Sequence, residues 1–413
     1  MRRPKVAPNR LGSEIGRGLR AEHSLAKCLS MRFSIVTWIG GLMAVWAGVG
    51  PVLAGPKPGE LVRSQQAVFR IEEVASGLGV PWGIAFLPDG DALFTEREGR
   101  VRWIRSGALV EQPVVGVPAV WARGQGGLLD IAVHPKFAQN RLVYLSYSVP
   151  DAKGEKAHTA LWQARFEAGE FRDGRVIFQP PERVFTGSGV HFGSRIVFDR
   201  AGFLFLAVGE RGDMQKSQDL QAYNGKVFRL RDDGTVPPDN PFAGRGYALP
   251  GIWSYGHRNP QGLAFHPVTG ELWEAEHGPK GGDELNIVRK GANYGWPVIT
   301  YGVNYNGSTI SEIQTKAGME QPQHYYVPSI AICGIAFSAG EAFPEWRGDL
   351  FAASLKFGYV ERLELAGGKV TATEKLLEGA GRTRHVAFSP DGALWVLLES
   401  PGRIWRLVPV AVP

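Results

Sequence analysis

The sequence predicts an all-β protein, a six-bladed β-propeller built from four-stranded antiparallel blades. The composition, a local phrase that recurs six times, and the spacing of its copies lead to this prediction. The 413-residue chain holds 54 Gly residues, strand-forming residues are plentiful, and no long amphipathic helical period stands out. That composition is typical of a β-protein with many turns.

The recurring phrase is a short apolar strand, a tight turn rich in Pro, Asp and Gly, and a second apolar strand. Its first copy runs from Gly83 to Phe94, with the turn at residues 88–90. Such turn residues supply the backbone angles that a hairpin requires. The six copies, aligned on residues 84, 131, 196, 263, 335 and 386, lie 47 to 72 residues apart. Most copies continue into a third strand-like run, as at residues 99–104, 226–230 and 403–407.

Six copies at this spacing indicate a radial repeat. The closed form of such a repeat is a propeller of six four-stranded blades. A β-sandwich also contains many hairpins, but it would not repeat one phrase six times. We expect residues 55–80 to supply a strand that closes the ring. Residues 301–327, rich in Gly, Asn and Gln, are expected to form an excursion from the blades.

Residues 1–54 are interpreted as a leader with a signal peptide, and residues 55–413 as the propeller. Met31 is the expected start, residues 35–49 are apolar, and the Val-Leu-Ala sequence ending at Ala54 has the small-residue form of a signal-peptidase site. The apolar run is shorter than the roughly 20 residues of a membrane span. The alternative is an uncleaved amphipathic anchor. We therefore expect an exported, periplasmic protein without stable membrane insertion after cleavage.

The formal net charge of +6 comes from the leader, which holds eight Lys and Arg against two Asp and Glu. The rest of the chain has equal numbers of basic and acidic residues. Sequence-independent nucleic-acid binding requires a broad basic track, so we expect no nucleic-acid partner. Cys28 lies in the leader and leaves Cys333 alone. The mature protein then has no internal disulfide, and its fold depends on the core.

Propeller geometry predicts where polar side chains converge. Innermost strands run in the same direction along the axis, so loops that enter first strands and loops that leave second strands share one face. The polar residues in these two kinds of loop are Gln125, His191, Arg258, Asn259, Arg382 and Arg384, and Glu96, Glu210, Arg211, His277 and Lys356. We expect them around one axial mouth. His134 and His266, each before a Pro in a hairpin turn, belong to the opposite face and are expected to be ordinary turn residues.

The predicted mouth contains four cationic side chains that can surround a small ligand, which are Arg258, Lys356, Arg382 and Arg384. Such a ring suits a compact polyanion. Arg grips a carboxylate with a planar fork, whereas Lys contributes a mobile point charge. In the alternative interpretation these residues only plug the propeller channel by pairing with Asp283, Glu210 or Glu276.

At these residues the sequence resembles the soluble quinoprotein glucose/sorbosone dehydrogenase family, in particular its aldose sugar dehydrogenase branch. The similarity covers roughly residues 74–408. Its motifs are, in chain order, GQGGLL at 124–129, HFGSR at 191–195, YGHRNPQG at 255–262, HGP at 277–279, DELN at 283–286, NYGWP at 293–297, SLK at 354–356 and RTR at 382–384. Any one of them can occur by chance, and the complete ordered set carries the resemblance.

The resemblance implies two cofactors, pyrroloquinoline quinone and calcium. The quinone carries three carboxylates, and the positions that match its binding residues in the family are Gln125, Arg258, Asn259, Tyr305, Lys356, Arg382 and Arg384. A calcium ion on the cofactor is expected at the backbone carbonyls of Gly278 and Pro279, because calcium prefers oxygen ligands and tolerates irregular geometry. Glu284 and Tyr294 match a further calcium position. For these two residues a surface carboxylate and a core aromatic are the alternatives.

The resemblance also implies that the anomeric carbon of an aldose sugar is oxidised to a lactone. The hydride passes to the bound quinone, and from there the electrons pass to an acceptor that the sequence does not identify. His191 matches the catalytic base, and a neutral imidazole has a suitable pKa for that task. Glucose dehydrogenases of the family have Asp at the positions of Val190 and Glu210. These departures favour the broader aldose branch, with Glu210 expected to accept a sugar hydroxyl.

Two other classes of function remain open at this point. The first is a non-enzymatic ligand-binding propeller, because a fold alone does not determine function. The second is a calcium-dependent lactone hydrolase, which also uses six-bladed propellers. That hydrolase would favour carboxylates and Asn around an axial metal, whereas the mouth predicted here is rich in Arg.

Overall fold

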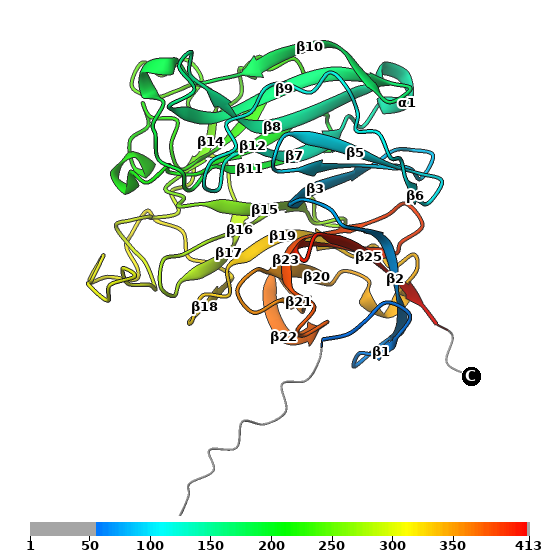
Figure 1. The fold of residues 1–413 in the computed structure, drawn as a ribbon. Coiled ribbons are helices and arrows are strands. Elements are labelled where there is room, and N and C mark those ends of the chain that lie inside the picture. Colours follow the sequence, from blue (N-terminus) through cyan, green and yellow to red (C-terminus); the bar gives the residue numbers. More distant parts are fainter. Residues whose placement is uncertain (1–54, 411–413) are drawn as a thin grey trace, which may run out of the picture. The chain divides into compact units, whose positions relative to one another are not determined.

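The computed structural model describes residues 55–410, so the predicted leader and its cleavage site lie outside the described residues. Six antiparallel sheets surround a central axis, with β3, β7, β11, β15, β19 and β23 innermost (Figure 1). The predicted six-bladed β-propeller is therefore confirmed. No helix among residues 55–410 is long and apolar enough to cross a membrane.

In each of the first three blades, the strands follow one another in chain order from the innermost to the outermost. Blade 1 contains β3 (Pro81–Phe86), β4 (Ala92–Glu96), β5 (Arg100–Arg105) and β6 (Ala108–Leu109). Blade 2 contains β7 (Leu128–Val133), β8 (Leu142–Pro150), β9 (Ala157–Glu167) and β10 (Glu170–Phe178), with α1 (Phe137–Asn140) in its first hairpin. Blade 3 contains β11 (Gly193–Phe198), β12 (Leu204–Val208), β13 (Lys226–Leu230) and β14 (Ile252–Tyr255), with 3₁₀ turns at Glu182–Val184 before it and Met214–Ser217 inside it.

The last three blades repeat this plan. Blade 4 contains β15 (Pro260–Phe265), β16 (Leu272–Glu276), β17 (Asp283–Val288) and β18 (His324–Tyr326). Blade 5 contains β19 (Ile332–Phe337), β20 (Leu350–Ser354), β21 (Tyr359–Ala366) and β22 (Lys369–Leu376), with a 3₁₀ turn at Pro344–Trp346. Blade 6 contains β23 (Arg382–Phe388), β24 (Leu394–Ser400) and β25 (Arg403–Pro409), joined by β2 (Val68–Ser76) and β1 (Leu61–Arg63).

Blade 6 closes the ring with both ends of the described chain. β2 pairs antiparallel with β25, which confirms the closing strand predicted within residues 55–80. The short β1 adds a fifth strand outside β2, so this blade exceeds the predicted four. The closure is fixed by packing: the fully buried Phe69 of β2 meets Phe343 and Trp346 of blade 5 edge-to-face, with ring centroids 6.4 and 5.8 Å apart.

The core lies between neighbouring blades and leaves the axis polar. Apolar side chains of one sheet pack against those of the next, as where Trp273 and Leu285 of blade 4 meet Ile332 and Leu350 of blade 5. The first four residues of β3, β7, β11, β15 and β19 are buried and the last two are half-buried. The buried end of each strand follows the loop that carries the predicted site residues. The predicted excursion, residues 301–327, is irregular up to residue 323, but its last part contains β18 of blade 4.

Candidate active site

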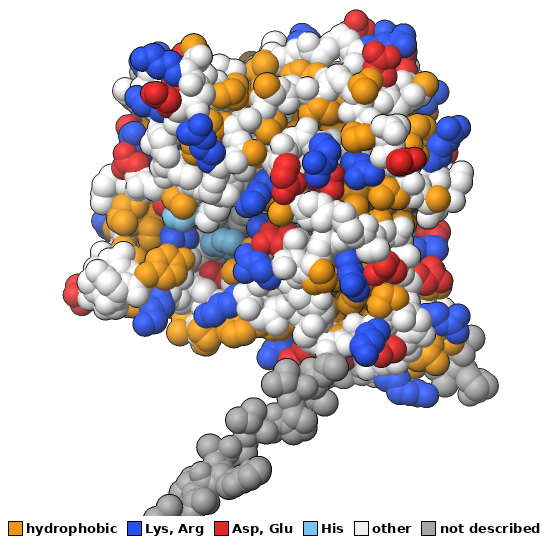
Figure 2. Space-filling view, viewed as in Figure 1, with side chains coloured by type: hydrophobic (Ala, Val, Ile, Leu, Met, Phe, Trp, Pro, Cys, Tyr) orange, Lys and Arg blue, Asp and Glu red, His pale blue; other side chains and the backbone are white. Residues whose placement is uncertain are grey.

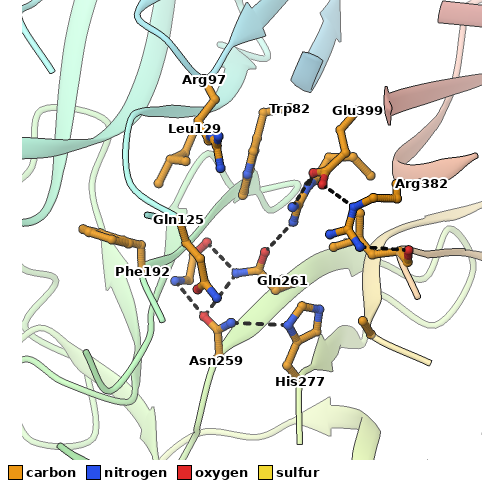
Figure 3. Close-up of a pocket in the computed structure, with 14 residues that line it drawn as sticks. Trp82, Arg97, Gln125, Leu129, Phe192, Asn259, Gln261, His277, Arg382 and Glu399 are labelled. Carbon is orange, nitrogen blue, oxygen red and sulfur yellow. Dashed lines mark hydrogen bonds and ion pairs between the residues drawn. The ribbon is translucent and has the colours of Figure 1, made fainter. Parts of the chain in front are cut away.

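A cavity of about 250 Å³ lies at the axis and is lined by residues from all six blades. The lining is formed by Trp82, Arg97, Gln125, Leu129, Phe192, Gly193, Asn259, Gln261, His277, Ala331, Leu355, Arg382, Arg384 and Glu399. Figure 3 shows several of these side chains directed at one space from different strands. In Figure 2, histidine side chains are recessed near the centre of the face, with Lys and Arg side chains beside them. The convergence predicted from propeller geometry is present for Gln125, Asn259, His277, Arg382 and Arg384.

The predicted site residues divide into three groups around this cavity. Gln125, Asn259, Arg382 and Arg384 line it directly, and His191 immediately precedes the lining residue Phe192. A second, much smaller cavity of about 10 Å³ is bordered by the predicted residues Arg258, Gly278, Glu284 and Tyr294. Lys356 and Tyr305 are exposed and belong to neither lining, with Tyr305 74% exposed on the excursion.

His191 is held in one orientation by two neighbours. Its backbone has a φ of 54°, a left-handed conformation that is uncommon outside Gly, Asn and Asp. Its backbone N–H donates to Oε1 of Gln125 at 2.8 Å, which ties blade 3 to blade 2. Its ring Nδ1 lies 2.5 Å from Oε1 of Glu210. With Nδ1 bonded to a carboxylate, Nε2 is the ring nitrogen that carries the free lone pair.

The pKa of His191 is lowered below its usual value of 6.5. Burial is the largest cause, because it disfavours the charged imidazolium, and Arg258 lowers the pKa further. The hydrogen bond to Glu210 acts in the opposite direction. The imidazole is therefore neutral near pH 7 and available to accept a proton.

The loop that carries His191 is anchored by Arg211. The Arg211 guanidinium donates to the carbonyl oxygens of Val190 and, at 2.6 Å, Ser188. Its Cζ atom lies 3.3 Å from the centroid of the Phe192 ring. Burial lowers the pKa of Arg211 to about 9, and the charge of Glu210 offsets only part of this effect. Propeller geometry places Arg211 in the mouth, and the structure adds that it supports the loop instead of facing the cavity.

Glu210 is placed behind the His191 ring. Only 3% of its side chain is exposed, and its second oxygen, Oε2, is buried without a hydrogen-bond partner among the described residues. Its backbone joins blades 3 and 4, because its N–H donates to the Arg258 carbonyl at 2.9 Å. This geometry identifies Glu210 as the partner of the imidazole. Direct contact of Glu210 with a sugar hydroxyl stays a prediction.

Arg382 and Arg384 share one carboxylate, Glu399. Nε of Arg382 lies 2.7 Å from Oε1 of Glu399 (Figure 3). Nη2 of Arg384 lies 2.5 Å from Oε2 of the same carboxylate. Burial raises the pKa of Glu399, but the two arginines outweigh burial and leave it lowered. Arg384 also donates to the amide oxygen of Gln261 at 3.0 Å. Two cations against one anion leave net positive charge on this wall of the cavity.

The channel-plug interpretation named the wrong residues. Among the described residues, the side chains of Arg258, Arg382 and Arg384 form no ion pair with Asp283, Glu210 or Glu276. A fully buried ion pair beside the cavity joins Arg195 to Asp130 at 2.9 Å, with the Arg195 guanidinium over the Trp82 ring. The charges of the arginines of the mouth are therefore not neutralised by the acidic residues that the alternative interpretation proposed.

Arg258 is bonded to the carbonyls predicted for calcium. Its Nη1 donates to the carbonyl oxygens of His277 at 2.9 Å and Gly278 at 2.7 Å. The carbonyl of Pro279 accepts the hydroxyl of Ser329 at 3.2 Å. Each carbonyl oxygen has a second lone pair. These oxygens therefore keep the capacity to bind a cation beside the cavity.

Blade 4 contains a buried cluster of carboxylates behind Gly278. Ligand atoms of His257, Glu274 and Glu276 lie within 4.8 Å of one another, and all three residues are buried. Burial raises the pKa of Glu284 to about 8, and the charge of Glu276 adds to this effect. Nδ1 of His257 and Oε1 of Glu274 have no hydrogen-bond partner among the described residues. A cation would neutralise this cluster and bind its unpaired atoms.

Tyr294 belongs to the same cluster and also has a role in the core. Its ring stacks on His257 with centroids 4.6 Å apart. Its hydroxyl donates to the carbonyl of Ile287 at 2.6 Å. The alternative interpretation of Tyr294 as a core aromatic is thus correct for its side chain, which leaves only its backbone for a metal.

The family model for glucose / sorbosone dehydrogenases matches residues 78–406. The chain belongs to this family. It is 44% identical over 350 residues to the aldose sugar dehydrogenase YliI of Escherichia coli (strain K12), covering 83% of this chain and 94% of that protein. The crystal structure of the soluble aldose sugar dehydrogenase from Escherichia coli in the apo-form is 42% identical, with a TM-score of 0.80, over 83% of this chain and all of that one.

Two further proteins are similar to this chain over most of the propeller. The PQQ-bound aldose sugar dehydrogenase from Streptomyces coelicolor is 28% identical, with a TM-score of 0.65, over 86% of this chain and 99% of that one. Quinoprotein glucose dehydrogenase B of Acinetobacter calcoaceticus is 28% identical over 333 residues, covering 73% of this chain and 67% of that protein. The resemblance stated from the motifs is confirmed.

Sequence reasoning missed several residues of the dehydrogenase cavity. Arg97 directly follows β4, and Glu399 lies near the end of β24. The same position in blade 4 correctly selected His277, which lines the cavity. Glu96, which the rule also placed in the mouth, instead pairs with Arg100 and Arg102. Applying the same rule in every blade would have found both Arg97 and Glu399. Trp82 lies inside an innermost strand, where an aromatic is indistinguishable from core in the sequence.

Proposed function

We propose that this chain is a quinoprotein aldose sugar dehydrogenase that oxidises the anomeric carbon of aldoses to lactones. Two observations carry this proposal: a neutral, carboxylate-bound His191 that directly precedes the lining residue Phe192, and the cationic wall of the axial cavity. When bound, pyrroloquinoline quinone would supply the acceptor for the hydride that leaves the sugar. Family membership supports the activity, and the PQQ-bound relative supports the identity of the quinone.

The cavity fits a compact polyanion. Arg97, Arg382 and Arg384 line it, and the single lining carboxylate, Glu399, is already paired with two of them. Arg forks suit planar carboxylates, and the amides of Gln125 and Asn259 offer neutral hydrogen bonds on the opposite side. Lys356 directly follows the lining residue Leu355, so it stands at the rim. In the proposal these residues hold the quinone, with Arg258 and Tyr305 as further contacts.

Calcium is the second proposed cofactor. The carbonyls of Gly278 and Pro279 would hold the ion that contacts the quinone. Glu284 and the backbone of Tyr294, which border the small cavity, would hold a further ion. Two carboxylates, Glu276 and Glu284, border a space of about 10 Å³, and oxygen-rich sites of this kind suit calcium. An ion there would also relieve the repulsion that raises the pKa of Glu284.

His191 would act as the general base in this reaction. Its Nε2 would take the proton of the anomeric hydroxyl as the C–H bond at the same carbon breaks. Glu210 would accept Nδ1–H throughout and stabilise the imidazolium that forms, as a carboxylate does for a catalytic histidine elsewhere. Gln125 and Arg211 would keep the loop, and therefore Nε2, in place.

The other classes of function find less support. A lactone hydrolase with an axial calcium would require free carboxylates at the axis, whereas the lining carboxylate Glu399 is bound by two arginines. A pure ligand-binding propeller would not require the buried pair of His191 and Glu210. The proposal includes export to the periplasm and electron transfer to an acceptor not identified here.

Reconstitution tests the proposed function. Purified protein freed of cofactor would be mixed with pyrroloquinoline quinone and calcium, and reduction of a redox dye would be followed after addition of glucose, xylose or maltose. The expected result is sugar-dependent dye reduction that requires both cofactors. Omission of quinone and replacement of glucose by sorbitol, which lacks an anomeric carbon, are the controls. Saturable quinone binding without sugar oxidation would reject the dehydrogenase in favour of the ligand-binding propeller.

A further inference from the structure

Gln261 lies at the axis between two groups of cavity residues. It is the second residue of β15, it is only 6% exposed, and it lines the axial cavity. Figure 3 shows its amide directed at Asn259, with the pair of Arg382 and Glu399 on the other side. Sequence reasoning gave this residue no role. A buried amide in such a place requires hydrogen-bond partners, from neighbouring residues or from a ligand.

The amide oxygen of Gln261 fixes the orientation of Arg384. Its Oε1 accepts a hydrogen bond from Nη1 of Arg384 at 3.0 Å. Glu399 binds the other two nitrogens of the same guanidinium, Nε at 2.8 Å and Nη2 at 2.5 Å. Nη1 also contacts Sγ of Cys333 at 3.5 Å, which is a weak acceptor. Because all three nitrogens are bonded, the guanidinium plane has one orientation, and one N–H on Nη2 is left for a ligand.

The amide nitrogen of Gln261 sets the direction of the Asn259 amide. Nε2 of Gln261 donates to Oδ1 of Asn259 at 3.1 Å and to the carbonyl oxygen of Gly193 at 3.2 Å. The backbone N–H of Gly193 donates to the same Oδ1 at 3.1 Å. Two donors on Oδ1 determine which end of the Asn259 amide faces them. Nδ2 of Asn259 is therefore turned the other way, toward Nδ1 of His277 at 3.5 Å, and gives the cavity an N–H donor.

The backbone of Gln261 is fixed by a buried ion pair. Its carbonyl oxygen accepts a hydrogen bond from Nε of Arg195 at 2.7 Å. Arg195 is 1% exposed, and its Nη1 lies 2.9 Å from Oδ1 of Asp130. The Arg195 guanidinium lies over Trp82, 4.1 Å from the ring centroid. Residues of blades 1, 2 and 3 thus hold the strand that carries Gln261, so its amide is in place before a ligand arrives.

We propose that Gln261 is a positioning residue for the quinone. It holds the Arg384 guanidinium toward a carboxylate of the ligand, and it turns an N–H of Asn259 into the cavity. This inference rests on the proposed function, because the quinone is the ligand assigned to both groups. Nε2 of Gln261 already donates within the protein, so Gln261 acts through its neighbours. Groups that are oriented in advance lose less conformational freedom when the ligand binds, which strengthens binding.

The test measures quinone affinity by titration of the cofactor-free protein in the presence of calcium. Gln261→Met keeps the length of the side chain but removes its hydrogen bonds to Arg384 and Asn259. The Kd for quinone should rise about tenfold, the effect of one lost hydrogen bond to a charged group. Gln261→Asn keeps the amide but draws it back by one methylene. It should weaken quinone binding as well, and it replaces Gln261→Met if that variant does not fold.

Gln163 supplies a matched control on β9. It is 4% exposed, its Oε1 accepts a hydrogen bond from Nε of Arg175 at 3.0 Å, and its Nε2 donates to the Tyr144 hydroxyl at 2.7 Å. Gln163 does not line the cavity. In chemical denaturation, Gln163→Met should lose about as much stability as Gln261→Met, but its quinone affinity should equal that of wild type. An equal loss of quinone affinity in both variants would overturn the proposal, because it would show a general effect on the fold.

A double-mutant cycle separates positioning from direct contact with the quinone. If Gln261 acts through Arg384, the rise in Kd caused by Gln261→Met should be at least about threefold smaller in the Arg384→Ala background than in wild type, because residues in one hydrogen-bond network are not additive. An equal rise in Kd in both backgrounds would overturn the positioning role.

The fate of the proposed function is a separate outcome. A protein that binds quinone with this pattern but does not oxidise glucose would reject the dehydrogenase and keep the positioning role. Glucose oxidation together with unchanged quinone affinity in Gln261→Met would reject the positioning role and keep the dehydrogenase. Failure of the wild type to bind quinone would overturn both.

Discussion

The Nδ1 atom of His191 lies 2.5 Å from Oε1 of Glu210, and both groups are withdrawn from solvent. Burial lowers the pKa of His191, and Glu210 partly compensates this effect. The pair thus keeps the imidazole neutral while directing its free lone pair away from the carboxylate. Arg211 and Gln125 hold the same loop from two other directions.

Replacement of Glu210 by Gln should separate catalysis from cofactor binding. The amide can donate to Nδ1 and favour the wrong tautomer, so the rate of sugar oxidation should fall by about 10² to 10⁴. Quinone affinity, measured by titration, should stay near wild type because Glu210 does not line the cavity. Glu210→Asp, which keeps a carboxylate, is the control and should retain more activity. Full activity in Glu210→Gln would show that the buried pair is structural only.

The pH dependence of kcat/KM should have an acidic limb below pH 6.5. The base must be neutral, and the pKa of His191 in the fold lies below that value. Activity is therefore retained at neutral pH and lost as the pH falls through the lowered pKa. Glu210 raises this pKa, so Glu210→Gln should move the limb to still lower pH. A limb centred above pH 6.5, or one that does not respond to this substitution, would assign the titration to another group.

Arg384 should contribute more to quinone binding than Arg382. The Arg384 side chain is 11% exposed and that of Arg382 is 51% exposed, and charge interactions weaken with solvent exposure. Arg384→Ala should raise the Kd for quinone by about 10- to 10³-fold, with a smaller increase for Arg382→Ala. Arg172→Ala, an exposed arginine on β10, is the control. Unchanged affinity in both cavity variants would remove the cationic wall from the cofactor site.

Closure of the ring should depend on Phe69. This side chain is fully buried against Phe343 and Trp346, and removal of a buried Phe side chain costs about 3–5 kcal/mol. Chemical denaturation of Phe69→Ala should show a loss of this size. Leu61→Ala, on β1 and 57% exposed, should unfold nearly as wild type. A small effect at Phe69 would mean that β2 contributes little to the stability of the closed propeller.

The fold was largely accessible from the sequence because one hairpin phrase marks every blade. Strand direction then fixed the face on which Gln125, Asn259, Arg382 and Arg384 converge. The pairing of both arginines with Glu399 depends on which side chain near the end of β24 faces them. The hydrophobic periodicity of the sequence does not show this. The contact of Arg258 with the Gly278 carbonyl is likewise a matter of side-chain conformation. β1 escaped prediction because three residues are too few for a recognisable alternation.

The most direct measurement is the single-turnover reduction of bound quinone by glucose, followed by stopped-flow absorbance in wild type and His191→Gln. Gln keeps a hydrogen-bonding group of similar size but no basic nitrogen. The account predicts rapid reduction in wild type, a rate about 10² to 10⁴ lower in the variant, and equal quinone and calcium affinities. Reduction of the variant at the wild-type rate would contradict the assignment of His191 as the base, and no reduction in loaded wild type would contradict the dehydrogenase itself.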